Sequence, residues 1–227
     1  MNTFLLDIKL QWQNGFYGAA AFVTVIWILI LRFTPIAEVE HILPFLVFGN
    51  LQISGLYFVA GIRLLEKDEG TLAAQILTPM SESHYLLSKV ASLGVLTLLE
   101  SLAFLYIGAG HEQVSFLAVV GIIVMSATFV LTGLICINYF NSLNEFMIPS
   151  IFIMFVLFLP VFNLFEFSDS WLFYLHPMQG PLMLLNISID GGNLSQWMFS
   201  LISSAIVLGG LFYWNHKNLY KIAGEGL

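Results

Sequence analysis

The most regular feature of the sequence is a series of long apolar stretches separated by shorter polar segments. A helix needs about 20 mainly apolar residues to cross the hydrocarbon core of a membrane. Stretches near 16–33, 43–62, 91–109, 115–137, 146–165 and 197–214 meet that requirement. They are continuous, whereas barrel strands alternate in segments of about ten residues. We therefore predict an all-α polytopic membrane protein with six transmembrane helices, formed by a single domain that covers residues 1–227.

The residues before the first apolar stretch have a helical pattern of their own. Phe4, Leu5, Ile8 and Trp12 recur at helical spacing. Polar residues lie largely on the opposite side: Asp7, Lys9, Gln11 and Gln13. This pattern predicts an amphipathic interfacial helix over residues 3–14, with a disordered tail as the alternative. The apolar stretch that follows is too long for a signal-peptide core, so we expect it to remain in the mature protein.

Two polar segments between the predicted spans are unusually long. The first, Arg63 to Lys89, contains a short helix-forming stretch that Pro79 stops, followed by a new helix start at Ser81. The second, from Glu166 to Gln196, is partly apolar but is interrupted by prolines. It is too broken to cross the membrane, and it predicts an external re-entrant helical hairpin between spans five and six.

Composition and charge narrow the class and set the orientation. Apolar residues make up 59% of the chain and charged residues 9%, so the surrounding solvent must be lipid. A net charge of -7 with no basic patch argues against nucleic-acid binding. Six of the seven basic residues fall on the side of the two termini: Lys9, Arg63, Lys67, Lys89, Lys217 and Lys221. By the positive-inside rule, we predict a multi-pass protein of the bacterial plasma (inner) membrane with both termini in the cytoplasm.

Motifs for chemistry are absent from the sequence. It contains no HExxH zinc pair, no GxSxG nucleophile elbow and no GxxxxGK[ST] phosphate-binding loop. The five histidines are scattered without the spacing of metal ligands. We therefore predict no catalytic residues, no metal and no cofactor in this chain, and any ATP-driven work requires another polypeptide.

The polar segment between the second and third predicted spans carries a recognisable order of residues. An acidic residue and Gly-Thr-Leu stand at positions 69–72, a Thr-Pro step at 78–79, and Tyr85 and Lys89 precede the third span. This order, in this place, resembles the type-2 ABC-transporter permease family. The resemblance is closest to the small permease subunits of fluoroquinolone exporters, judging from residues 7–16 and from Tyr174, Pro177 and Leu182. Ser88 stands where many members have glycine, which leaves the local bend open.

The resemblance implies partners as well as a fold. In that family the permease forms a dimer, here a homodimer by expectation, on two separate ATPase subunits that hold ATP and Mg. The segment between spans two and three would then be a cytoplasmic coupling helix that docks on the ATPase. Carried over residue by residue, the coupling positions are Glu69, Gly70, Thr71, Leu72, Ala73, Ile76, Thr78 and Pro79.

Polar residues inside the predicted spans are candidates for a substrate pathway. Glu100 lies near the middle of the predicted third span, with no cationic residue at similar depth. An acidic group there favours a functional or paired role. It could attract a cationic amphiphile, or it could bond to a polar residue of the second span. Asn50, Gln52 and Phe155 are the other candidates for the pathway, although interhelical hydrogen bonds explain the two amides equally well.

These observations favour the membrane subunit of a bacterial ABC exporter. It would move a small amphipathic compound outward, with a fluoroquinolone-like drug as the candidate that the resemblance suggests. The alternative is a proton- or ion-coupled secondary transporter that uses Glu100, although the spans show no inverted repeat. An intramembrane enzyme would need clustered Asp, His or Ser residues at the interface, and the sequence shows none.

Overall fold

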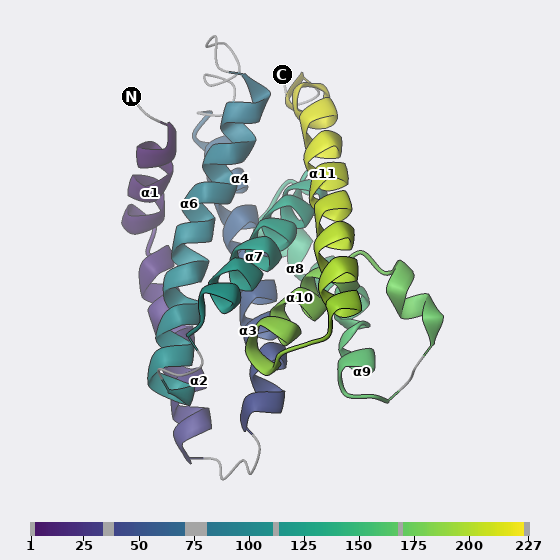
Figure 1. Ribbon diagram of the computed structural model, residues 1–227. Helices are drawn as coiled ribbons and strands as arrows, with labels where there is room; N and C mark the ends of the chain where they lie inside the picture. The colour runs from purple at the N-terminus through teal and green to yellow at the C-terminus, as the bar shows by residue number, and fades with distance from the viewer. Residues whose placement is uncertain (1–2, 34–38, 71–80, 111–113, 168–169, 225–227) are drawn as a thin grey trace.

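The chain folds into a bundle of helices in a computed structural model that describes residues 3–33, 39–70, 81–110, 114–167 and 170–224 (Figure 1). In chain order the elements are α1 (Thr3–Gln13), α2 (Phe16–Phe33), α3 (Val39–Ile53), η1 (Ser54–Phe58), α4 (Val59–Asp68), α6 (Glu82–Ala103), η2 (Phe104–Ala109), α7 (Phe116–Ile137), α8 (Leu143–Phe158), α9 (Val161–Leu164), η4 (Trp171–Leu175), α10 (Gln179–Asp190) and α11 (Leu194–Gly224). The described residues contain no β-strand, which confirms the predicted all-α class.

Six helical segments of the described chain are long and apolar enough to cross a membrane. They are Phe16–Phe33, Ile42–Asp68, Glu82–Ile107, Phe116–Ile137, Leu143–Leu164 and Leu194–Asn218. The number confirms the prediction. The start of α1 and the end of α11 lie at the same end of the bundle, as an even number of crossings requires (Figure 1).

The third span begins earlier than hydropathy alone predicts. Its helix starts at Glu82 instead of position 91, and the Ser81 hydroxyl caps it by accepting from the His84 backbone N–H at 3.4 Å. The first turns of α6 contain the polar residues Ser88 and Lys89, which are buried against other helices. A prediction from apolar stretches alone leaves such residues out of the span, although their polar groups have hydrogen-bond partners inside the protein.

Close packing of the second and fourth spans depends on two glycines. A Cβ at Gly55 would lie 2.6 Å from Cβ of Phe129, and one at Gly133 would lie 2.5 Å from Cγ1 of Val59. Small residues at such crossings let helix backbones approach closely in membranes. The segment around Gly55 is η1, a π-helical turn inside the second span. These contacts place α7 at the centre of the bundle (Figure 1).

The segment between the fifth and sixth spans is helical, as predicted, while its external, re-entrant position stays a prediction. The short 3-10 helix η4 precedes α10, and α10 packs against α11, α7 and α3. Leu182, Leu184 and Leu185 of α10 are buried, whereas Trp171 and Leu175 of η4 are exposed. Helix α10 is therefore part of the protein core.

Candidate functional site

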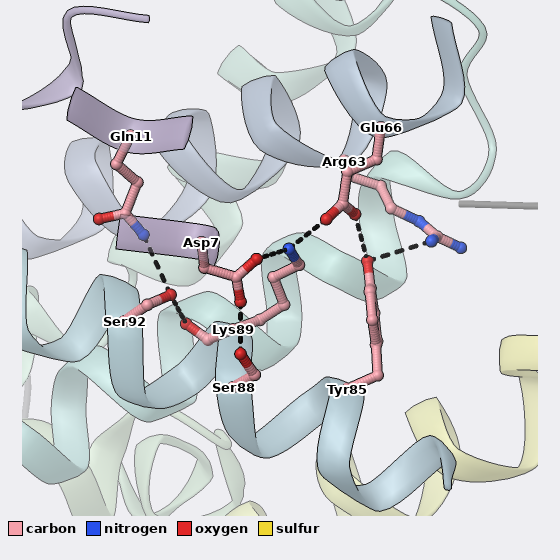
Figure 2. Close-up of polar contacts among 8 residues, drawn as sticks. All are labelled: Asp7, Gln11, Arg63, Glu66, Tyr85, Ser88, Lys89 and Ser92. Carbon is pink, nitrogen blue, oxygen red and sulfur yellow. Dashed lines mark hydrogen bonds and ion pairs between the residues drawn. The ribbon is translucent and has the colours of Figure 1, made fainter. Parts of the chain in front are cut away.

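A buried cluster of polar side chains joins α1, α4 and α6 at the end of the bundle where α1 starts (Figures 1 and 2). Hydrogen bonds and ion pairs connect its members across three helices. We call this cluster the Lys89 network; it consists of Asp7, Gln11, Arg63, Glu66, Tyr85, Ser88, Lys89 and Ser92.

The ammonium group of Lys89 is the centre of the network. It lies between the carboxylates of Asp7 on α1 and Glu66 on α4, and it forms an ion pair and hydrogen bond with each (Figure 2). Asp7 and Lys89 are 0% exposed and Glu66 is 1% exposed. Isolated charges at such depth are strongly unfavourable, so each of these groups depends on the others.

Tyr85 makes a second connection between α6 and α4. Its hydroxyl donates to Oε2 of Glu66 at 2.8 Å and accepts from Nη1 of Arg63 at 3.1 Å. Both cations also lie near its ring: Nζ of Lys89 is 5.1 Å and Cζ of Arg63 is 5.5 Å from the ring centroid. With two basic and two acidic side chains, the network is formally neutral. Near neutrality is expected, because a net charge buried inside a bundle is strongly unfavourable.

Two hydrogen bonds fix how α1 lies against α6. The Ser88 hydroxyl donates to Oδ2 of Asp7 at 2.5 Å, and Nε2 of Gln11 donates to Oγ of Ser92 at 3.0 Å. Both pairs are separated by 81 residues, so α1 and α6 run parallel and in register over this turn. The predicted helix is confirmed, but Asp7 and Gln11 face α6, while Leu5 and Trp12 remain exposed.

The Lys89 network contains residues that come before and after the predicted coupling segment in the chain. Helix α4 ends at Asp68 and α6 begins at Glu82, so the network connects the two helices that flank this segment. Glu69 and Gly70 form the turn after α4, where Gly70 has a φ of 65° that favours glycine. The other predicted coupling positions lie outside the described residues: Thr71, Leu72, Ala73, Ile76, Thr78 and Pro79.

Two additional polar contacts connect this end of the bundle to its other helices. Nζ of Lys67 donates to Oδ1 of Asn141, in the turn between α7 and α8, at 2.6 Å. Nδ1 of His216 on α11 lies 2.9 Å from a carboxylate oxygen of Glu82 at the start of α6. These contacts connect α4 to the turn before α8, and the start of α6 to α11.

The predicted pathway residues do not share one site. Glu100 lines a groove beside α2 that none of the other three residues lines. Nε2 of Gln52 donates to the backbone carbonyl of Met154 on α8 at 2.7 Å, which is the interhelical role that the sequence left open. Asn50 is buried, and Phe155 is exposed on the outer face of α8. A pathway role for these residues stays a prediction.

Sequence reasoning missed the connection among Asp7, Arg63 and Glu66, and it used Lys89 only as a loop marker and as a basic residue. A signal was present. Asp7 and Gln11 are four residues apart, as are Ser88 and Ser92, so each pair presents polar groups on one helix face. Nothing in the sequence shows that these two faces meet.

Other chemistry-bearing groups lie apart from the network. The described residues contain no cluster of three or more His, Cys, Asp or Glu side chains that could hold a metal ion. His176 lies between η4 and α10, where burial lowers the pKa of its imidazole, and its Nδ1 accepts from the Met178 backbone N–H at 3.2 Å. A neutral ring fits that acceptor role.

The fold and the network define a polytopic helical membrane protein in which a buried charge cluster joins the helices beside a loop. Residues 1–222 match the model of the fluoroquinolones export permease protein family, and the chain belongs to that family. Two similar proteins are fluoroquinolones export permease proteins of Mycobacterium tuberculosis, from strains CDC 1551 / Oshkosh and ATCC 25618 / H37Rv. Each is 27% identical over 213 residues, covering 91% of this chain and 88% of the relative. The chain is a multi-pass membrane permease.

Proposed function

We propose that this chain is the membrane subunit of an ABC exporter, which moves an amphipathic compound outward when a separate ATPase subunit hydrolyses ATP. The observation that carries the proposal is the Lys89 network. It joins the two helices on either side of residues 69–80, where the sequence resembles the coupling helix of type-2 ABC permeases. In this proposal, residues 69–80 dock on the ATPase and the network passes their movement to the spans.

The geometry supports a mechanical role because the network is buried and connects three helices. Lys89 cannot leave Asp7 or Glu66 without leaving a buried carboxylate without its counter-ion. Helices α1, α4 and α6 are therefore coupled and move together. A displacement of the loop then reaches α2 directly through α1, which precedes it in the chain.

The proposed complex contains two permease copies and two ATPase subunits at the membrane of a bacterial cell. ATP and Mg would be bound by the ATPase, and this chain would provide the route across the membrane. The relatives' names point to fluoroquinolones as cargo, which makes an amphipathic drug of this type the first compound to test.

Coexpression with an ATPase encoded in the adjacent reading frame tests the assignment. We expect the two proteins to purify as a complex whose ATP hydrolysis in lipid vesicles is stimulated by a fluoroquinolone. Thr71→Ala, Leu72→Ala and Pro79→Ala should abolish stimulation without reducing the amount of permease in the membrane.

Leu5→Ala is the control, because Leu5 is exposed on α1 and lies outside both the loop and the network. It should leave stimulated hydrolysis unchanged. Full stimulation in all three loop variants would contradict the assignment, as would transport by the permease alone.

A proton- or ion-coupled secondary transporter is the second candidate, and one observation favours it. Both carboxylate oxygens of Glu100 are buried without a hydrogen-bond partner, as expected of a residue that binds and releases a proton inside a membrane. This candidate predicts uptake into vesicles that contain the permease alone, driven by an imposed proton gradient and lost in Glu100→Gln. The ABC proposal predicts no such uptake.

A further inference from the structure

A groove of about 310 Å³ lies between α2 and the α6–η2 segment. Both elements lie at the edge of the bundle (Figure 1). Small and aliphatic side chains form most of its wall, including Ala20, Ala21, Ile28 and Ala103. Glu100 provides the only carboxyl group of the wall. The volume falls at the lower end of the range typical of small-molecule sites.

Glu100 has no ion-pair partner among the described residues. The residue is 5% exposed, and neither of its carboxylate oxygens forms a hydrogen bond. Ser54 of η1 lies close to the carboxyl group without reaching hydrogen-bond geometry. None of the salt bridges found among the described residues involves Glu100. A buried acidic group without an ion-pair partner favours the binding of a ligand that carries a positive charge.

The backbone near Glu100 is irregular in two places, one on the second span and one on the third. The π-helical turn η1 begins at Ser54 on the second span, and η2, also π-helical, begins at Phe104, one turn after Glu100. Single π-helical turns occur frequently at functional sites, because they shift side chains out of regular helical register. This observation is independent of the charge of Glu100.

The groove opens at the outer surface of the bundle. Val25 on α2, together with Leu99 and Ile107 on the other wall, is between 48% and 56% exposed. These apolar side chains surround the opening, and both walls belong to segments that are long and apolar enough to cross a membrane. A molecule dissolved in the bilayer could enter the groove sideways, without first passing through water.

We propose that this groove binds an amphipathic organic cation, whose protonated amine pairs with Glu100 while its apolar body lies against α2 and η2. As a step in export the site rests on the proposed function, but binding itself requires no ATPase. A purely apolar lipid chain would leave the carboxylate unpaired. A second copy of the chain, related by a twofold axis through the groove, would bring two carboxylates together instead of a cation.

A pair of nearly isosteric ligands tests the proposal directly. N-benzylhexylamine is protonated at neutral pH, whereas N-benzylhexanamide has nearly the same shape and no charge. We would measure equilibrium binding of both, in tritiated form, to the purified full-length permease in phosphatidylcholine nanodiscs, with binding to empty nanodiscs subtracted. We expect the amine to bind about tenfold more tightly than the amide, from one charge-assisted hydrogen bond.

Variants separate the charge from the shape of the groove. Glu100→Gln should remove the preference for the amine and leave amide binding unchanged. Ala21→Phe, which fills the groove, should weaken both ligands by about tenfold or more. The matched controls are Glu82→Gln, the same change elsewhere on α6, and Ala19→Phe, the same change at an exposed α2 position outside the groove. Both should bind like the native protein.

The outcomes distinguish this site from the proposed function. An amine preference that survives Glu100→Gln, or equal binding of amine and amide by the native protein, would overturn the site. Neither result would affect the stimulation of a partner ATPase through residues 69–80. Conversely, loss of amine preference in Glu100→Gln would support the site even if no ATPase associated with the chain.

Discussion

Two buried charged regions of this permease differ in how their charges are satisfied. At the end of the bundle where α1 starts, Lys89 is enclosed by carboxylates, a tyrosine and serines from three helices. Further along the same helix, about 16 Å away, Glu100 is buried with neither oxygen bonded. The first arrangement holds helices together, and the second has unused binding capacity. Burial of a charge therefore does not by itself indicate function; the state of its partners does.

The largest effect is expected from removing the central cation of the network. Lys89→Met should lower the free energy of unfolding by about 3–5 kcal/mol, because Asp7 and Glu66 then remain buried without the ammonium group. Unfolding by SDS in mixed micelles, followed by circular dichroism, measures the change. Lys67→Met, at an exposed lysine of α4, should change stability by no more than about 1 kcal/mol. Equal losses in the two variants would contradict a structural network.

A smaller loss is expected from the hydroxyl that joins α6 to α4. Tyr85→Phe removes one donor to Glu66 and one acceptor for Arg63 but keeps the ring. Leaving those buried groups short of a partner should reduce the free energy of unfolding by about 1–3 kcal/mol. Tyr139→Phe, at an exposed tyrosine, is the control, and the same SDS titration compares them.

A double-mutant cycle tests whether the two charged regions are independent. Asp7→Ala and Lys89→Met should show an interaction energy of about 0.5–3 kcal/mol, because the two side chains form an ion pair. Lys89→Met and Glu100→Gln should be additive within about 0.5 kcal/mol, because they are distant and share no partner. Strong coupling in the second cycle would show that the two charged regions are not independent.

The smallest effect, of opposite sign, is expected at Glu100. Glu100→Leu should raise the free energy of unfolding by about 1 kcal/mol, because an acidic group without partners is unfavourable in the membrane interior. Glu100→Gln keeps a polar group there and should lie near the native value. A clear loss of stability in Glu100→Leu would indicate that the carboxyl group has a structural partner.

Much of the fold could be predicted because lipid imposes a simple rule on the sequence. Every backbone polar group in the hydrocarbon region must be bonded within the segment, so long apolar stretches become helices. The six long apolar helices follow from that rule. Span boundaries were less accurate where polar residues continue a helix inside the protein, as Ser88 and Lys89 do in α6.

The candidate site was only partly predictable. Glu100 was a candidate because charged residues are rare within apolar stretches, whereas Lys89 entered only as a marker of the loop and as a basic residue. Asp7 and Glu66 were not candidates, since each lies near a predicted polar segment where a solvated side chain is the ordinary expectation. Their partners in the network are 19 to 82 residues away along the chain, and no local spacing reports contacts at that range.

The sequence by itself determined that this chain crosses a membrane as helices, where those helices lie along the chain, and to which family it is related. These properties depend on local composition and order, because the bilayer acts on each segment separately. Only the tertiary structure decided that Lys89 is fully paired while Glu100 is not. That difference depends on which helix faces meet, and helix faces meet through packing between segments that are distant in the chain.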